Sequence, residues 1–176
     1  MKKRRDHHVQ QRYDKERQRN VMAKPGVHQF CLVLDHLKPF FNPPKIFRSA
    51  EAFGASGIWL VGIGPFDPAP AKGSFRKVPA RFFDSFSDCH LDLQQSGYQP
   101  FVLDPQADLL LTQVPLPAKT AFIFGHEELG CSFAAADYPD LTRLKIPQFG
   151  SVQSLNVSIA ASVTMYEFAR QHTEPK

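Results

Sequence analysis

Short, continuous runs of apolar residues recur along the chain from residue 28 onward, and stretches with helical patterning separate them. The runs lie at residues 30–34, 58–61, 100–103, 121–124 and 144–146. Strands that are buried on both faces have this composition because neither face can carry polar side chains. Their alternation with crossover helices predicts one α/β domain with about five strands in a mostly parallel sheet, and helices on both faces.

Three amphipathic segments are expected to form the helices that cover this sheet. The first spans residues 42–53, with Asn42 as its N-cap, proline at the first helical position and Gly54 at its end. The second lies near residues 84–96. The last is expected to run from residue 154 to about residue 170.

Positive charge is concentrated at the start of the chain. The first 28 residues hold nine Lys and Arg against three Asp and Glu, a net charge of +6 in a chain whose total is +4. We place a domain boundary near residue 25, so residues 1–25 form a basic extension and residues 26–176 the main domain. The extension has almost nothing of its own to bury, so if ordered it is expected to be a helix leaning on the body. Its charge indicates a polyanionic partner, and a helix that only aids solubility is the alternative.

Cysteine and histidine usage argues against disulfide and metal sites. The chain has an odd number of cysteines and no Cys-x-x-Cys spacing, which suits a reducing compartment; they are Cys31, Cys89 and Cys131. The seven histidines form no ligand pattern. No apolar run approaches the roughly 20 residues of a membrane helix, and polar residues follow the basic start where a signal peptide would be apolar. We therefore expect a cytoplasmic protein without a metal or a membrane partner.

Ligands of parallel sheets bind beyond the carboxyl ends of the strands, which directs attention to the loops there. These loops span residues 35–43, 62–78, 125–132 and 147–154. Gly62-Ile63-Gly64 follows a strand, but no third glycine opens a helix, so the dinucleotide fingerprint fails. The chain also lacks a P-loop and a Gly-x-Ser-x-Gly nucleophile motif.

Three of these regions carry recognisable motifs. In residues 34–55, Asn42 and Arg48 stand six apart ahead of the run SAEAFG. Residues 124–132 read FGHEELGCS, and residues 146–158 read IPQFGSVQSLNVS. In order and spacing they resemble the three motifs of the SpoU class of the SPOUT RNA ribose 2′-O-methyltransferase family. The resemblance covers residues 28–170 and leaves only the basic extension outside it.

The resemblance implies a C-terminal trefoil knot and an S-adenosyl-L-methionine cofactor held largely by backbone groups of the knot. It also implies methylation of a ribose 2′-hydroxyl in structured RNA by a homodimer that is joined through its last helix. The implied cofactor-binding residues are Phe124, Gly125, Gly130, Ile146, Pro147, Ser154 and Leu155. The implied catalytic residues are Arg48, Asn42, Glu127, Ser154 and Asn156.

These residue types suit the reaction. A hydroxyl that attacks a sulfonium methyl group must lose its proton, so the site has to position both substrates and stabilise a developing alkoxide. The planar guanidinium of Arg48 can grip a phosphate and direct a donor at that oxygen, although the family's use of this Arg as a base is the alternative. Glu127 could orient Arg48 or a substrate hydroxyl. Ser154 and Asn156 are expected at a helix start, where free amides bind phosphate or ribose.

Each residue also has a structural interpretation. Asn42 and Ser154 could be helix N-caps, Arg48 could pair with Glu51 one turn on, and the glycines could serve only in turns. Only the combined spacing of the motifs favours catalysis. A catalytically inactive RNA-binding dimer of the same fold is therefore the alternative function.

The chain departs from the family pattern at two places. His126 stands where the family commonly has Asn, and the pair Pro43-Pro44 replaces smaller residues and removes two backbone donors. Both departures concern the fit of the substrate. Transfer RNA is favoured over ribosomal RNA, because the first motif most resembles the transfer-RNA branch.

Overall fold

A computed structural model gives the fold; it describes the backbone of residues 2–173 and the side chains of residues 7–173. The strands are β1 (Cys31–Asp35), β2 (Gly57–Val61), β3 (Ala80–Phe83), β4 (Gln99–Leu103), β5 (Leu109–Leu110), β6 (Thr120–Phe124) and β7 (Thr142–Lys145). The α-helices are α1 (Lys2–Asn20), α2 (Asn42–Ala52), α3 (Phe86–Gln95) and α4 (Val157–His172). Short 3-10 turns lie at η1 (Ala69–Ala71), η2 (Ser74–Arg76), η3 (Leu111–Gln113) and η4 (Ala135–Asp137).

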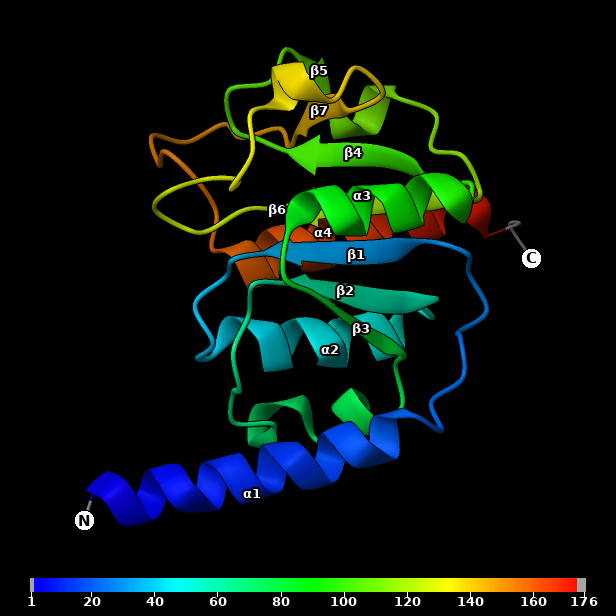
Figure 1. Cartoon of the computed structure of the whole chain (residues 1–176). Coiled ribbons are helices and arrows are strands. Elements are labelled where there is room, and N and C mark those ends of the chain that lie inside the picture. Colours follow the sequence, from blue (N-terminus) through cyan, green and yellow to red (C-terminus); the bar gives the residue numbers. More distant parts are fainter. Residues whose placement is uncertain (1, 174–176) are drawn as a thin grey trace.

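The strands form one seven-stranded sheet in the order β3-β2-β1-β6-β4-β7-β5, and every pairing is parallel. The α/β class with a parallel sheet is thus confirmed. The carboxyl ends of the strands gather at one edge, the left side of Figure 1, toward which the arrows point. The C-terminal knot that the resemblance implies stays a prediction.

Helices cover both faces of this sheet, as expected. Alternate residues of β1 divide between two hydrophobic clusters: Leu32 and Leu34 face the side of α2 and α4, whereas Cys31 and Val33 face α3. The period of two along a strand explains this division. The core therefore has two layers, and all five residues of β1 are buried.

Helices α2 and α4 lie against each other and run in the same direction. The hydroxyl of Ser49 lies 2.8 Å from that of Ser162, and the rings of Phe53 and Tyr166 follow one turn later at 6.4 Å. Both helices therefore begin at the same edge of the sheet, where the strands end. The first turn of α2 carries Pro43 and Pro44 instead of backbone donors, and the amide of Ser158 in the first turn of α4 donates to Asn156.

Helix α1 packs on the body through a few residues of its inner side. Tyr13 is only 2% exposed and its ring lies 5.2 Å from that of Phe66 and 5.5 Å from that of Phe75. The buried amide of Asn20 accepts a hydrogen bond from the backbone of Ala80 at 2.9 Å. The expectation of a helix leaning on the body is confirmed, and among residues 7–20 only Tyr13 and Asn20 are buried. One large aromatic ring and one buried amide, together with an ion pair between Arg12 and Asp67, join it to the body. The domain boundary near residue 25 stays a prediction.

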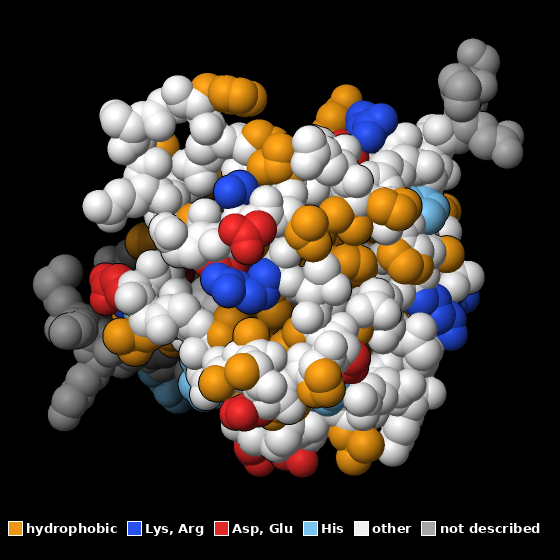
Figure 2. Space-filling view, turned by 90° about the horizontal axis from the view of Figure 1, so that it is seen from above, with side chains coloured by type: hydrophobic (Ala, Val, Ile, Leu, Met, Phe, Trp, Pro, Cys, Tyr) orange, Lys and Arg blue, Asp and Glu red, His pale blue; other side chains and the backbone are white. Residues whose placement is uncertain are grey.

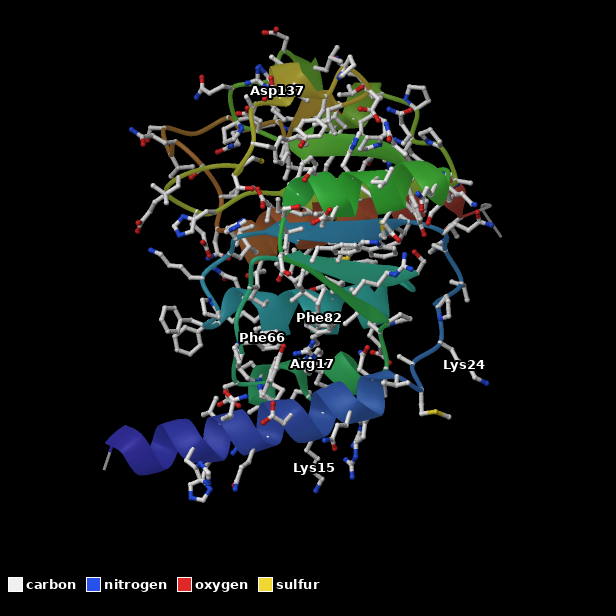
Figure 3. The ribbon with its side chains drawn as sticks, viewed as in Figure 1. Lys15, Arg17, Lys24, Phe66, Phe82 and Asp137 are labelled. Carbon is white, nitrogen blue, oxygen red and sulfur yellow. The ribbon has the colours of Figure 1, made fainter. Side chains whose placement is uncertain are left out.

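The two sides of α1 differ, as Figure 3 shows. Arg17 points inward, with its guanidinium carbon 4.0 Å from the ring centre of Phe82, while Lys15 points away from the body. The N-terminal half of α1 projects past the body on the side where the strands end (Figure 1).

The expected strand count was too low. β3 and β5 were missed because both lie at the edges of the sheet, where the buried-strand pattern fades. β3 reads ARFF with Arg81 exposed, and β5 has only two residues. Within the described part of the chain, none of the helices has the length and hydropathy that crossing a bilayer requires.

Candidate functional site

A cavity of about 410 Å³ opens at the carboxyl ends of β4 and β6, beside the first turn of α4. Its walls come from residues 102–105, 124–127, 130–131, 146, 148, 154–157 and 160. This volume falls within the range of about 300–1,000 Å³ that is typical of small-molecule sites. The cavity thus unites the ends of three neighbouring strands with a helix start, where a parallel sheet is expected to bind its ligand.

The loop after β6 needs its two glycines for geometric reasons. A Cβ atom on Gly125 would lie 2.5 Å from the carbonyl carbon of Gly130, so the backbone can pass there only without a side chain. Gly130 itself has a φ of +74°, in the region that other residues avoid. Their interpretation as turn residues is therefore correct, and the turn they make forms part of the cavity wall.

His126 closes the same loop. Its backbone exchanges two hydrogen bonds with Gly130, at 2.8 and 2.9 Å, and its Nδ1 accepts from the amides of Glu128 and Leu129 at 3.1 and 3.2 Å. An Asn side-chain oxygen commonly accepts backbone amides two residues on in this way. The ring nitrogen of His126 thus supplies the kind of acceptor that the family's Asn would offer.

Three side-chain contacts join this loop to the loop between β1 and α2. Asp35 accepts from Ser132, Lys38 donates to Glu128 at 2.7 Å, and Asn42 donates from Nδ2 to Oε1 of Glu127 at 2.6 Å. The contacts form because β1 and β6 are neighbours in the sheet, so the loops after them emerge side by side. The hydrogen bond from Lys38, and then its charge, lowers the pKa of Glu128.

The predicted role of Asn42 as an N-cap is wrong. The N-cap of α2 is Phe41, and no side-chain hydrogen bond caps this helix. Asn42 is the first helical residue, and its amide group is engaged with Glu127 instead. The prolines that follow cost little, because first-turn amides have no partner inside a helix.

Arg48 stands apart from the cavity wall. It is exposed on α2, and among the described residues its guanidinium has no ion pair or side-chain hydrogen bond. The alternative pairing with Glu51 is not formed, and Glu51 accepts from Lys77 at 3.0 Å instead. The structure therefore does not bring Arg48 into contact with Asn42 or Glu127, and its charged end is free to meet a polyanion.

Ser154 and Asn156 both line the cavity. Both were expected at the start of the last helix, but only Asn156 lies there. Helix α4 begins at Val157, so Ser154 lies in the preceding loop and is not its N-cap. Asn156 is the N-cap, since its Oδ1 accepts from the amide of Ser158 at 3.0 Å and from the Ser158 hydroxyl at 2.7 Å. The helix starts later than predicted because Asn156 supplies the cap.

Six of the seven predicted cofactor-binding residues lie in the cavity wall: Phe124, Gly125, Gly130, Ile146, Ser154 and Leu155. Pro147 does not line it, although the residues on either side, Ile146 and Gln148, do. Sequence reasoning missed Asp104, Cys131 and Gln148. Asp104 follows β4 directly, so the rule on strand ends could have found it.

Two of the missed residues define the chemistry of the wall. Burial raises the pKa of the Cys131 thiol to about 12, so this thiol stays neutral and is not a thiolate nucleophile. The Oε1 atom of Gln148 is buried and has no hydrogen-bond partner among the described residues. Such an atom is costly unless a ligand donates to it.

Comparison with known proteins places these features in context. The model of the SpoU rRNA Methylase family matches residues 29–166. An uncharacterized tRNA/rRNA methyltransferase of Synechocystis sp. is 35% identical over 156 residues, which cover 85% of this chain and 56% of that protein. The 23S rRNA (guanosine-2′-O-)-methyltransferase RlmB of Xylella fastidiosa is 28% identical over 88% of this chain and 64% of that protein. The chain thus spans roughly three fifths of the length of these relatives.

Solved structures agree in fold. The SpoU methyltransferase AviRb of Streptomyces viridochromogenes, in complex with the cofactor AdoMet, matches with a TM-score of 0.73 and 27% identity over 84% of this chain and 59% of that one. A structure described as giving insights into the 2-OH methylation of C/U34 on tRNA matches with a TM-score of 0.69 and 27% identity. That match covers 82% of this chain and 96% of the other.

Proposed function

The chain belongs to the SpoU rRNA methylase family, and we propose that it transfers a methyl group from S-adenosyl-L-methionine to a ribose 2′-hydroxyl of RNA. The observation that carries this proposal is the hydrogen bond of 2.6 Å between Asn42 and Glu127. It joins the first motif to the second at the wall of the cavity, so residues 85 positions apart form one site. Arg48, on the same helix, adds a cation that has no ion pair among the described residues.

The cavity suits the cofactor. Residues of the glycine loop and of the segment after β7 line it, and the Oε1 of Gln148, which has no partner among the described residues, offers an acceptor for an amino or hydroxyl group. The carboxylate of Asp104 lies in the wall as well, where Arg143 donates two hydrogen bonds to its Oδ2. When bound, S-adenosyl-L-methionine supplies a methyl group that is activated by a sulfonium centre.

The residues of the chain would then act on the hydroxyl. We assign Arg48 to stabilise the developing alkoxide and to hold a neighbouring phosphate, with a side chain that leans toward the N-terminal end of its own helix. Glu127 orients the amide of Asn42 through their hydrogen bond. Ser154 and the first turn of α4, with its positive dipole end, are proposed to hold ribose or phosphate.

The RNA is proposed to approach from the side where the strands end. The face above β5 has Lys and Arg side chains only at scattered points, among acidic and hydrophobic ones (Figure 2). A polyanion therefore finds no continuous basic surface there. Helix α1 lies at the end of the molecule away from β5. Its basic first turns project past the body on the side where the strands end (Figure 1).

We favour transfer RNA as the substrate over ribosomal RNA. The support is the match to the structure concerned with methylation of C/U34 on tRNA, 96% of which this chain covers. The match to the 23S rRNA enzyme RlmB keeps ribosomal RNA as the competing substrate.

We further propose a cytoplasmic homodimer that is joined through α4. Ile159, Val163 and Tyr166 are exposed on this helix at spacings of four and three residues, which places them on one side of it. Three large apolar side chains in a line require cover, and a second copy of the same helix supplies it by two-fold symmetry.

The proposal is tested by incubating the protein with labelled S-adenosyl-L-methionine and either transfer RNA or ribosomal RNA lacking modifications. A methylated 2′-hydroxyl can no longer attack the adjacent phosphate, so alkaline hydrolysis should leave a gap at one position. Total RNA from a strain without the protein should regain cleavage at that position. Label that enters a base, or no label in either RNA, would contradict the proposal.

A further inference from the structure

Phe40 and Phe41 are exposed side by side just before α2. Their exposed fractions are 65% and 71%, whereas Phe47, one turn into the helix, is fully buried. A single exposed apolar residue is ordinary, but two adjacent aromatic rings beside a site lose much of the free energy that burial would give. The pair therefore calls for a partner that covers it.

The local backbone holds both rings in place. The amide of Phe40 donates to the carbonyl of Lys38 at 2.8 Å, which makes a tight turn. Phe41 is the N-cap of α2 and already has right-handed helical dihedrals, and the buried Pro43 and Pro44 follow it. The backbone that carries both rings is thus ordered by a turn and a helix start, which lowers the entropy cost of binding.

Cations flank the pair in the sequence. The segment 36–48 contains Lys38, Lys45 and Arg48 and no acidic residue. Lys38 is bound to Glu128 of the facing loop, while the exposed Lys45 has no ion pair among the described residues. Exposed aromatic rings interleaved with Lys and Arg are the features with which proteins bind single-stranded nucleic acid: bases stack on the rings and the cations follow the backbone.

The rings also lie next to the proposed reaction site. Asn42 follows Phe41 directly and donates to Glu127 in the wall of the cavity. The loop that carries the rings lies on the side toward which the strands point (Figure 1). A nucleotide whose ribose reaches the cavity therefore has its own base, or the next one, within reach of this pair.

We propose that Phe40 and Phe41 form a stacking platform for an unpaired RNA base, so that the substrate is a single-stranded or loop segment of RNA. This inference rests on the proposed function for the placement of the ribose. A base inside a duplex cannot offer its face to a side chain, whereas a base splayed from a loop can. The rings, rather than any hydrogen bond, would then set this preference, which tolerates different bases.

The decisive variant is the double substitution Phe40→Leu with Phe41→Leu, which retains apolar area and removes the aromatic faces. The double substitution to Tyr retains the faces and serves as the rescue. Leu91→Ala is the matched control, because it removes an exposed apolar side chain from α3 on the opposite face of the sheet.

The probe is a short single-stranded RNA that carries one 2-aminopurine, with the same strand in a duplex for comparison. Binding is followed by anisotropy and stacking by quenching of the 2-aminopurine. We expect the Leu variant to bind the single strand about tenfold more weakly and to lose the quenching, as the loss of one stacked base predicts. The Tyr variant and Leu91→Ala should resemble the parent, and duplex binding should not change.

Two outcomes would overturn the platform. One is single-strand affinity and quenching in the Leu variant equal to those of the parent. The other is an altered association state in light scattering with unchanged RNA affinity, which would make the pair an interface between copies. A parent that binds and quenches as expected yet transfers no methyl group would instead count against the proposed function and leave the platform standing.

Discussion

The fully buried carboxylate of Asp35 accepts two hydrogen bonds from Ser132, one from the backbone amide at 2.6 Å and one from the hydroxyl at 2.8 Å. The two residues are 97 positions apart. Asp35 ends β1 and Ser132 ends the glycine loop after β6, so this contact fixes the loop against the sheet. The ring of His36 lies 2.8 Å from the same carboxylate and completes its set of partners.

Asp35→Asn should destabilise the protein by about 1.5–3 kcal/mol, the usual value of hydrogen bonds to a charged group. The new amide has one accepting oxygen in place of two, so it cannot keep all three contacts with Ser132 and His36 as the carboxylate makes them. Because the loop forms part of the cavity wall, the Kd for S-adenosyl-L-methionine should rise as well. Denaturant unfolding and calorimetry measure the two effects. Ser132→Ala retains the backbone amide and should show a smaller loss of stability; an equal loss would contradict this account.

Arg48→Ala should reduce turnover by at least about 10²-fold, on the scale of a lost donor to a developing oxyanion. The side chain is exposed and has no ion pair within the described part of the chain, so the unfolding midpoint and cofactor affinity should stay close to those of the parent. Single-turnover methylation at saturating RNA gives the rate. Arg48→Lys keeps the charge without the planar fork, and should recover only part of the activity. Turnover within a few-fold of the parent in the Ala variant would refute the assigned role.

Ile159→Glu should dissociate the proposed homodimer, because it places a charge on the apolar side of α4 that a second copy would cover. Light scattering at micromolar concentration should show a dimer for the parent and a monomer for the variant. The control is Leu91→Glu, which introduces the same charge on α3, away from the apolar side of α4. It should leave the molecular mass in solution equal to that of the parent. A monomeric parent would rule out the dimer.

Replacing Lys2, Lys3, Arg4 and Arg5 with Gln should weaken RNA binding and flatten its salt dependence. Each phosphate contact contributes a slope of about −0.7 for single strands, so three or four contacts predict a change of roughly 2–3 units. Substitution is preferable to deleting residues 1–24, because deletion would remove Tyr13 and Asn20 from the body. The affinity for S-adenosyl-L-methionine should not change.

The control for this extension is Lys119→Gln. Lys119 is exposed and donates to the carbonyl of Ser96, at the edge where β4 and β6 begin, away from the cavity. One charge lost there should leave the slope nearly as it is. If the slope of the fourfold variant equals that of the parent, the extension does not bind RNA and serves only as a packed, solvated helix.

The apolar runs of the central strands were sufficient to predict most of the sheet. β1, β2 and β6 are buried at every position, so their composition alone identified them. The same rule placed the site, since the ends of parallel strands share one edge. The three motifs then identified the family, which no single residue could have done.

Weak local signals account for the elements that were missed or misplaced. The edge strand β3 is only half-buried, so charge interrupts its apolar pattern. The start of α4 depends on whether Ser154 or Asn156 accepts hydrogen bonds from the first backbone amides of the helix, and both residue types are good N-caps. Nothing local decides between them, because the choice depends on where β7 delivers the chain.

Side-chain partners could not be predicted from the sequence for a different reason. Asn is a residue type that commonly caps helices, but Asn42 proved to be a partner of Glu127. The two meet because β1 and β6 are adjacent and the loops after them lie together. Tyr13 is one of two apolar residues in the charged helix α1, with Val9, yet its ring packs against two phenylalanines far along the chain. Periodicity records which face of an element is buried. Strand order in the folded sheet determines which groups meet there, and that order arises only when the whole chain packs.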